Sequence, residues 1–136
     1  MQVPAHRTGL FVVLGLYLVL GILYAVRTPA WQTPDEPAHV QVVAQLAESG
    51  CCPVIAPGDW DQALLSELTS ARFAPELLDA IPSIQYEDHQ PPLFYLLAMP
   101  VYTAAGGGWL ALRLLSLLLG AGVVIAAYAA ARMLLP

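Results

Sequence analysis

The long uncharged stretch near the start of the chain constrains the fold most. Residues 8–26 form a run of 19 positions without a charged side chain, with Arg7 before it and Arg27 after it. As a helix this run extends roughly 28 Å, which matches the hydrocarbon thickness of a bilayer. A cleaved signal peptide is the competing interpretation, but the apolar region of such a peptide is typically only about 7–15 residues long. We therefore expect a retained transmembrane helix within residues 1–27.

Two further apolar segments lie in the C-terminal part of the chain. Residues 93–112 carry no charge but contain Pro100 and three consecutive glycines at 106–108, which predicts a short helix over 93–105 followed by a turn. A third helix is expected over 109–135, with Arg113 near enough to its start for the side chain to reach the interface. The sequence thus predicts an all-α membrane protein with three transmembrane helices and a large loop over 28–92.

Composition supports a membrane protein and argues against nucleic acid as a partner. Apolar residues make up 58% of the chain, charged residues make up 11%, and the mean hydropathy is +0.65. The formal net charge is −5, with no lysine and only scattered arginines, whereas proteins bind phosphate backbones through clustered basic residues. For three spans, the positive-inside count places Arg7 and Arg113 on one side and Arg27 and Arg132 on the other. This balance leaves the orientation open.

The start of the loop has the pattern of a helix N-terminus. Thr33 is suited to cap a helix, with Pro34 in the first helical position and Glu36 three residues after the cap. We expect the helix to cover 34–49 and to end at Gly50.

The same segment carries the first cluster of candidate site residues. Asp35 and His39 are four residues apart, and Glu36 and His39 are three apart, so on a helix the imidazole can approach either carboxylate. Acidic residues in a first helical turn also suit the helix dipole without any catalytic purpose.

A second cluster stands at the far end of the loop. Residues 86–93 (YEDHQPPL) again combine acidic residues with a histidine, where the chain enters the next apolar segment. Pro91 and Pro92 restrict the backbone at this point. The two clusters could converge on one site, or this segment could simply be a polar helix start with an interfacial tyrosine.

Two short helices are expected in the middle of the loop. Asp59 followed by Gln62 can begin the first of them, and Pro75 can begin a second that runs to about Ile81. One face of the first helix is apolar and combines Trp60, Leu64, Leu68 and Ala71. Such helices could lie on the membrane surface or pack on the rest of the protein.

Divalent metal binding is an alternative use of the polar residues. Asp35, Glu36, His39, Asp88 and His89 all have side chains that can bind a metal, although no spacing among them is a recognised metal signature. Adjacent cysteines rarely form a disulfide with each other, so neutral packing is the expectation for the pair Cys51-Cys52.

Taken together, these motifs resemble the membrane glycosyltransferases of the GT-C class. An Asp-Glu pair follows the first transmembrane segment, and a His/Lys-Pro-Pro-Leu type of entry leads into the next apolar helix. Residues 57–61 (PGDWD), 70–73 (SARF) and 88–95 (DHQPPLFY) look like the first external loop of bacterial members, and residues 112–116 (LRLLS) look like part of their third helix. The likeness is nearest to the group of protein O-mannosyltransferases and lipid A aminoarabinose transferases, often labelled family 39 or phospholipid carrier-dependent glycosyltransferases.

The resemblance implies an inverting enzyme that moves a sugar from a polyprenyl-phosphate donor to a hydroxyl acceptor on the extracytoplasmic side. A hydroxyl is a weak nucleophile, and a carboxylate placed to take its proton typically contributes about 10²–10⁴-fold. Asp35 matches the catalytic base of the family, and Glu36 would orient the acceptor or support Asp35. The loop 28–92 would then be extracytoplasmic, in a protein of the plasma membrane.

Other polar residues would support this pair. The resemblance implies a supporting shell formed by His39, Glu87, Asp88 and His89. Arg113 is a candidate for a contact with the lipid phosphate. The chain departs from the aminoarabinose transferases in having Gln90, not lysine, before the two prolines, which puts a positive contact from that position in doubt.

Members of the family are much longer and have many more transmembrane helices than 136 residues can supply. We therefore expect the N-terminal segment of a longer or split transferase, which is inactive alone and needs a further membrane chain or region to complete the site. The alternative is a small non-catalytic membrane subunit. It would bind a polyprenyl lipid, or another membrane protein through the small residues of its third helix.

Overall fold

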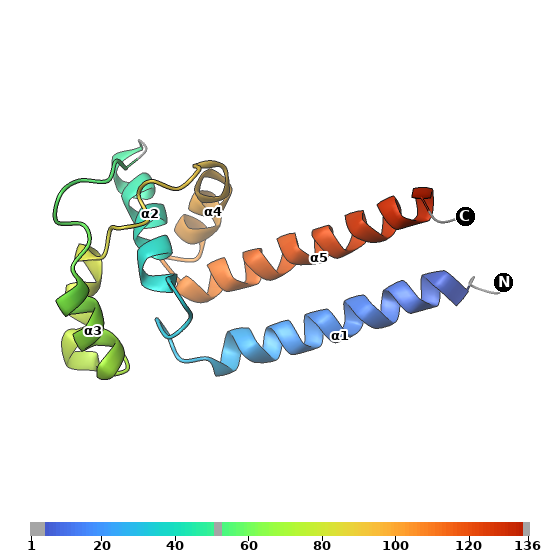
Figure 1. The fold of residues 1–136 in the computed structure, drawn as a ribbon, viewed down its shortest axis with the longest axis horizontal. Coiled ribbons are helices and arrows are strands. Elements are labelled where there is room, and N and C mark those ends of the chain that lie inside the picture. Colours follow the sequence, from blue (N-terminus) through green and yellow to red (C-terminus); the bar gives the residue numbers. More distant parts are fainter. Residues whose placement is uncertain (1–4, 51–52, 135–136) are drawn as a thin grey trace. The chain divides into compact units, whose positions relative to one another are not determined.

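The protein is entirely helical over the part of the chain that the structure covers. The computed structural model describes residues 5–50 and 53–134, so the expectation for Cys51 and Cys52 falls outside the described residues. The described residues contain no strand, and their elements are α1 (Ala5–Arg27), α2 (Glu36–Ser49), α3 (Gln62–Ser70), the 3-10 helix η1 (Pro75–Ser83), α4 (Leu93–Ala104) and α5 (Trp109–Leu134) (Figure 1).

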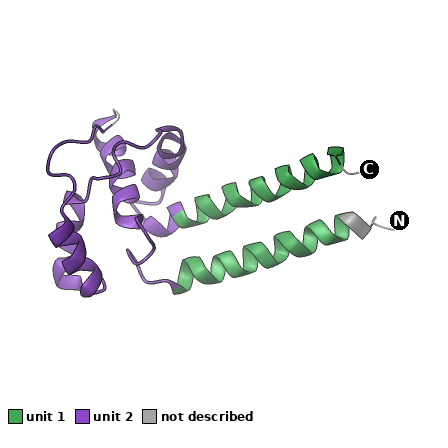
Figure 2. Ribbon diagram, viewed as in Figure 1, with its two compact units in different colours: residues 1–27, 113–136 green, residues 28–112 purple. Residues whose placement is uncertain are grey.

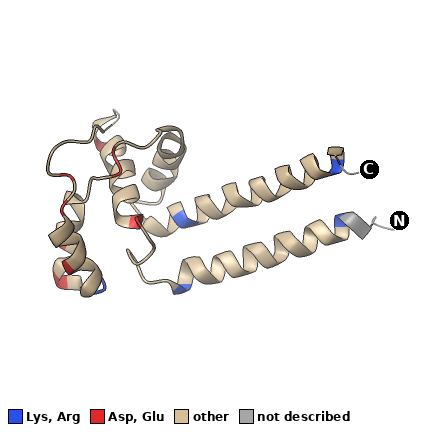
Figure 3. Ribbon diagram, in the orientation of Figure 1, with Lys and Arg blue, Asp and Glu red and all other residues tan. Residues whose placement is uncertain are grey.

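The chain divides into two compact units (Figure 2). Unit 1 contains residues 1–27 and 113–136, and unit 2 contains residues 28–112. Unit 2 carries all the acidic residues of the chain, whereas the basic residues lie mostly near the ends of the two long helices (Figure 3). This separation divides an apolar unit from an acidic one.

Unit 1 is an antiparallel pair of long apolar helices. Two stretches are long and apolar enough to cross a membrane: residues 7–27 of α1, with a mean hydropathy of 2.5, and α5, with a mean hydropathy of 2.3. In each of them only 6% of the most apolar window is buried, so almost all of these side chains are exposed or only partly covered. The first and third apolar helices expected from the sequence are confirmed as helices of membrane-spanning length.

Polar and close contacts join the two helices of unit 1. The Tyr17 hydroxyl of α1 donates a hydrogen bond to the backbone carbonyl of Leu117 on α5 at 3.2 Å. A Cβ atom added at Gly120 would meet that hydroxyl, and one added at Gly21 would meet the Leu117 side chain. Glycine at both positions therefore allows the helices to approach each other closely.

The second apolar helix is too short to confirm a third span. Helix α4 has 12 residues and is about 18 Å long. It continues through Pro100 and ends at Ala104. It packs against α2, with Tyr95 and Ala98 buried, while Leu93 and Leu97 remain exposed. Two candidate spans, not three, are therefore what the described residues provide.

The antiparallel pair changes which arginines lie together. Arg27 and Arg113 fall at one end of unit 1, where Arg113 Nη1 donates to the Ala25 carbonyl at 2.8 Å, and Arg7 and Arg132 fall at the other. The count expected for three spans had paired Arg7 with Arg113. Each end still carries two arginines, so the balance persists with different pairs.

Unit 2 is built around α2. The apolar face of α2 is buried through Val40, Val43 and Leu46, and the helix packs on both α4 and η1. A separate core cluster is formed by residues from three segments, namely Ala38, Leu68 and Ile84. The side chains packed against this cluster are Leu64, Leu65, Phe73, Leu77 and Tyr86.

The two short helices in the middle of the loop form with shifted boundaries. Asp61, not Asp59, caps α3, because its Oδ1 accepts from the backbone N–H groups of Ala63 and Leu64 at 2.9 and 3.0 Å. Leu68 of α3 is 0% exposed. Packing on the rest of unit 2 was one of the two alternatives expected for these helices. Trp60, which was expected on the apolar face of the first helix, lies just before α3.

Candidate functional site

The two ends of the loop meet at a carboxylate. The Tyr86 hydroxyl donates a hydrogen bond to Asp35 Oδ1 at 2.7 Å, across 51 residues of sequence. Asp35 is exposed, and it adopts a left-handed backbone conformation with φ 57° immediately before α2. Few residues other than glycine occupy that region, and such positions cluster at functional sites. The convergence expected from the sequence is therefore present for Asp35 and the segment that contains Tyr86.

The expected cap by Thr33 is wrong. Asp35 is the N-cap residue of α2, without a side-chain capping bond, and Pro37 occupies the first turn where Pro34 was expected. Both prolines suit that turn because they lack an N–H group, so the sequence alone does not separate them. Among the described residues, the buried hydroxyl of Thr33 has no hydrogen-bond partner.

Glu36 holds the segment before α2. Its carboxylate accepts a hydrogen bond from the backbone N–H of Trp31 at 2.8 Å, and the residue is only 8% exposed. Trp31 itself has φ 68°, so the chain turns sharply here. This geometry gives Glu36 a structural role beside Asp35.

The imidazole of His39 is bonded to a tyrosine and not to the carboxylates expected for it. His39 Nδ1 lies 2.8 Å from the hydroxyl of Tyr95, with the two rings stacked at a centroid distance of 6.0 Å. Tyr95 is 3% exposed and reaches His39 because α4 packs on α2. Tyr95 was not expected at the site, because its only sequence signal is one of three hydroxyl groups in a largely apolar helix.

Glu87 and Asp88 are buried and held by amides. Gln90 donates to Glu87 Oε2 at 2.7 Å, and Gln45 of α2 donates to both carboxylate oxygens of Asp88 at 3.2 and 3.3 Å. Burial raises the pKa of Asp88 above its ordinary value; the Gln45 hydrogen bond opposes this shift and the charge of Asp59 adds to it. Gln45 was also missed, because a helical glutamine gives no sequence signal of such a partner.

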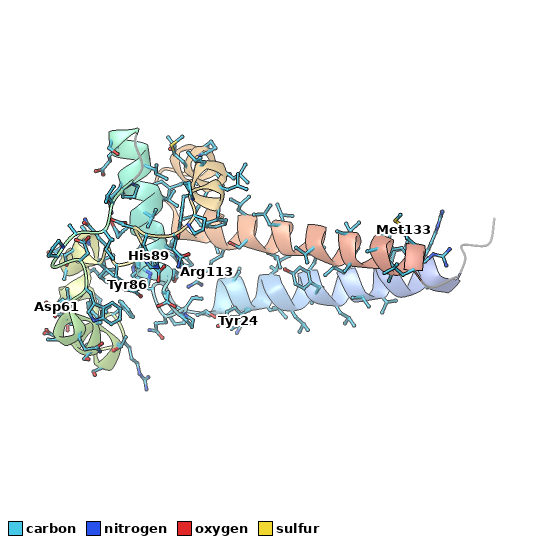
Figure 4. The ribbon with its side chains drawn as sticks, turned by 45° about the horizontal axis from the view of Figure 1, so that its top comes forward. Tyr24, Asp61, Tyr86, His89, Arg113 and Met133 are labelled. Atoms are coloured by element: carbon cyan, nitrogen blue, oxygen red, sulfur yellow. The ribbon has the colours of Figure 1, made fainter. Side chains whose placement is uncertain are left out.

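His89 belongs to the same turn but faces solvent. Its Nδ1 lies 3.0 Å from the Tyr86 carbonyl, and since a carbonyl only accepts, this nitrogen carries the proton and Nε2 does not take part in the bond. Figure 4 shows Tyr86 and His89 close together.

Burial and the nearby Asp35 carboxylate raise the pKa of Tyr86, so the phenol remains protonated as a donor.

The geometry supports a metal site or a phosphate-binding site less well than it supports a base at Asp35. No three His, Cys, Asp or Glu side chains of the described residues lie in an arrangement that could hold a metal ion. Arg113 belongs to unit 1, and one of its bonds goes to Ala25. Unit 2 has a single basic residue, Arg72, which lines an open pocket of about 210 Å³ with Gln32, Thr69 and Phe73.

The arrangement around Asp35 can support proton abstraction. One carboxylate oxygen is oriented by the phenol of Tyr86, and the residue is open to solvent, so the group can receive a proton from an incoming hydroxyl. Comparisons with protein-family models, curated proteins and solved structures find no match to this chain.

Proposed function

We propose that this chain is the N-terminal segment of an inverting membrane glycosyltransferase. The sugar would pass from a polyprenyl-phosphate donor to a hydroxyl acceptor on the extracytoplasmic face of the plasma membrane. The observation that carries the proposal is the hydrogen bond from Tyr86 to Asp35, which joins the two ends of the acidic loop at an exposed carboxylate.

Asp35 is the proposed catalytic base. It lies at the N-terminus of α2, and its backbone conformation is unusual for a residue with a side chain. The Tyr86 phenol limits the rotation of the carboxylate, because it binds one oxygen and leaves the other to face an acceptor. A base fixed in this way takes the proton of the acceptor hydroxyl as that oxygen attacks the sugar.

The neighbouring polar residues are proposed to position the base and not to react. Glu36 fixes the turn before α2 through Trp31. The bonds from His39 to Tyr95 and from Gln45 to Asp88 tie α2 to α4 and to the turn that carries Tyr86. Together they hold both partners of the Asp35–Tyr86 bond in place.

A groove for the lipid donor must come from further helices. Unit 1 supplies two apolar helices of spanning length, and Arg113 is the candidate for a phosphate contact from it. We propose that another membrane region or chain adds the remaining helices and basic residues. Transfer then depends on that assembly and not on these residues alone.

A paired substitution tests the proposal in membranes of the native source, with the variant gene in place of the original. Asp35→Asn removes the base but keeps the size of the side chain, and transfer of radiolabelled sugar should fall by about 10²–10⁴-fold. Asp79→Asn is the matched control, because Asp79 is exposed on η1, and it should leave transfer unchanged. Full transfer by Asp35→Asn in correctly inserted protein would overturn the proposal.

The second candidate is a non-catalytic subunit that binds another membrane protein. It is favoured by Gly122 on α5, where an added Cβ would meet no described atom within 4 Å, so this part of the helix can accept a partner. Under this function, Asp35→Asn would leave complex formation and transfer intact. A bulky Gly122→Leu substitution would instead dissociate the complex, as measured by co-purification.

A further inference from the structure

We propose that Trp60 is a stacking platform for a pyranose ring beside Asp35. The inference rests on the proposed function and assigns the sugar-contacting surface of that same site. Trp60 would position the ring and take no part in the proton transfer.

Trp60 presents an indole that the fold does not bury. It is 57% exposed, although most large aromatic and apolar side chains of unit 2 pack inward. Its ring contacts Tyr86 edge to face, with centroids 4.9 Å apart and planes at 75°. This contact is a favourable aromatic geometry, and it restrains the indole from one side.

The backbone around Trp60 is held on both sides. The Asp59 carboxylate accepts a hydrogen bond from the Ala56 N–H, which closes the turn before it. The Asp61 carboxylate caps α3 by accepting from Ala63 and Leu64. An exposed side chain on a fixed backbone loses little conformational freedom when a ligand binds, which favours a binding surface.

Tyr86 connects this surface to the proposed base. Its ring contacts Trp60 and its hydroxyl binds Asp35, so the indole and the carboxylate are neighbours of one residue. A pyranose has apolar C–H faces and a rim of hydroxyls. One face would stack on Trp60, while the hydroxyls would meet the carboxylates of Asp35 and Asp59. This pairing of an apolar face with acceptor groups is the chemistry of carbohydrate binding.

A membrane surface is the other class of contact that an exposed tryptophan suits. The charges disfavour it here. Asp59 and Asp61 flank Trp60, and Arg72 is the only basic residue among residues 28–112, which contain all ten carboxylates of the chain. Insertion of Trp60 would bring these carboxylates towards lipid headgroups, many of which are anionic, with almost no compensating positive charge.

Binding is tested in nanodiscs with Trp60 as the single tryptophan, using the background Trp31→Phe and Trp109→Phe. Four probes of two kinds separate the source of the sugar: polyprenyl-phosphate glucose and polyprenyl-phosphate mannose represent donors, and methyl glucoside and methyl mannoside represent free sugars. We expect the fluorescence of Trp60 to change on titration with at least one probe. Brominated lipids in the nanodisc should not quench it. Quenching by these lipids, or no response to any of the four sugars, overturns the proposal.

Transfer in native membranes supplies the second readout. Trp60→Ala should raise KM for the sugar substrate about tenfold with kcat within about twofold, and Trp60→Phe should recover most of the loss because it keeps an aromatic face. Val54→Ala is the control, since Val54 is 80% exposed in the same loop. An unchanged KM for Trp60→Ala contradicts the platform.

The two proposals fail in different ways. If Asp35 is not the base, transfer survives Asp35→Asn while sugars still alter the fluorescence of Trp60. If Trp60 is not the platform, Asp35→Asn abolishes transfer while the fluorescence of Trp60 does not respond.

Discussion

The two units use apolar residues in opposite ways. In unit 1, α1 and α5 bury almost none of their apolar side chains, whereas in unit 2 Ala38, Leu68 and Ile84 are almost completely buried. Unit 1 has no acidic residue, and unit 2 has ten. Among the described residues, unit 1 therefore has almost no internal core, as is typical of helices that an apolar surrounding covers, whereas unit 2 forms a core of its own.

Helices α4 and α5 are both apolar in sequence, but they differ in length and in burial. Helix α5 has 26 residues and α4 has 12. The shorter helix is below the typical length of a transmembrane helix, and it buries Tyr95 and Ala98 where it packs against α2. Length, and not apolar composition, separates a candidate span from a helix that packs within unit 2.

The membrane topology predicts which positions of the chain an external reagent can label, and each position should be either fully labelled or not labelled. In a chain with Cys51→Ser and Cys52→Ser, single cysteines are placed at Thr8, Val54, Gly106 and Met133, and intact cells are treated with an impermeant maleimide. With α1 and α5 as the two spans, Gly106 should be labelled on the same side as Val54. Met133 should be labelled on the same side as Thr8.

The opposite labelling pattern would show that α4 is a third span. If α4 crossed the membrane, the cysteine at position 106 would share the side of Thr8, and the cysteine at 133 would share the side of Val54. That result would move α4 from the acidic unit to the membrane and restore three spans.

Core substitutions should affect the two units differently. Leu68→Ala removes a side chain that is 0% exposed, and should lower the free energy of unfolding of unit 2 by about 2–5 kcal/mol. Leu118→Ala changes a residue of α5 that is 64% exposed, and it should change this free energy by less than about 0.5 kcal/mol. Urea titration of the full chain in detergent, followed by tryptophan fluorescence, measures both. Equal effects would mean that unit 2 has no core of its own.

The sequence predicts the long helices well because their signal is local. Uncharged runs bounded by arginines mark α1 and α5, and Gly50 marks the end of α2. The third span expected at α4 is not confirmed, because apolar composition does not say whether lipid or protein covers a helix. That depends on the packing of Tyr95 and Ala98 against α2, which is a long-range contact.

The sequence indicates that the two ends of the loop can meet, but it does not predict the bonds that join them. The pairing of Asp35 with the far end of the loop follows from two similar clusters, yet the partner is Tyr86 and not a histidine. Helical spacing places His39 within reach of either Asp35 or Glu36, but its imidazole meets Tyr95 across 56 residues. Spacing along a helix identifies which local pairs can form, while a tertiary partner can displace them.

Asp88 is expected to make unit 2 depend on pH. Its pKa is raised by burial, so the folded state holds the proton more tightly than the unfolded state does. The stabilisation is fully present below the ordinary aspartate pKa of about 3.8 and is lost as pH rises through the raised pKa of the folded state. Asp88→Asn should therefore stabilise unit 2 at pH 7 by on the order of 1 kcal/mol, with little effect near pH 3.

Urea unfolding at the two pH values measures this difference. Asp79→Asn is the control on the exposed surface of η1, and it should change stability little at either pH. Destabilisation by Asp88→Asn at pH 7 would show that the bonds from Gln45 outweigh the cost of burying the charge.

A glycine substitution in α5 tests whether α1 and α5 form a specific pair or are independent helices, and it should change the free energy of their association only slightly. Gly120→Ala places a Cβ against the Tyr17 hydroxyl, so the tyrosine must move and lose its bond to the Leu117 carbonyl. The loss should be about 0.6 kcal/mol, the average for such bonds between membrane helices. Resonance energy transfer between labels at Thr8→Cys and Met133→Cys, in a chain with Cys51→Ser and Cys52→Ser titrated with dodecyl sulfate, reports the separation of α1 and α5.

Gly122→Ala is the matched control on the same helix, because its Cβ would meet no described atom within 4 Å. It should leave the pair intact or stabilise it slightly, since alanine favours a helix over glycine. Tyr17→Phe removes the hydroxyl that the new Cβ would meet, so the added cost of Gly120→Ala should shrink in the double variant. Equal titration curves for both glycine variants would mean that α1 and α5 do not recognise each other, and that unit 1 is held together only by the membrane around it.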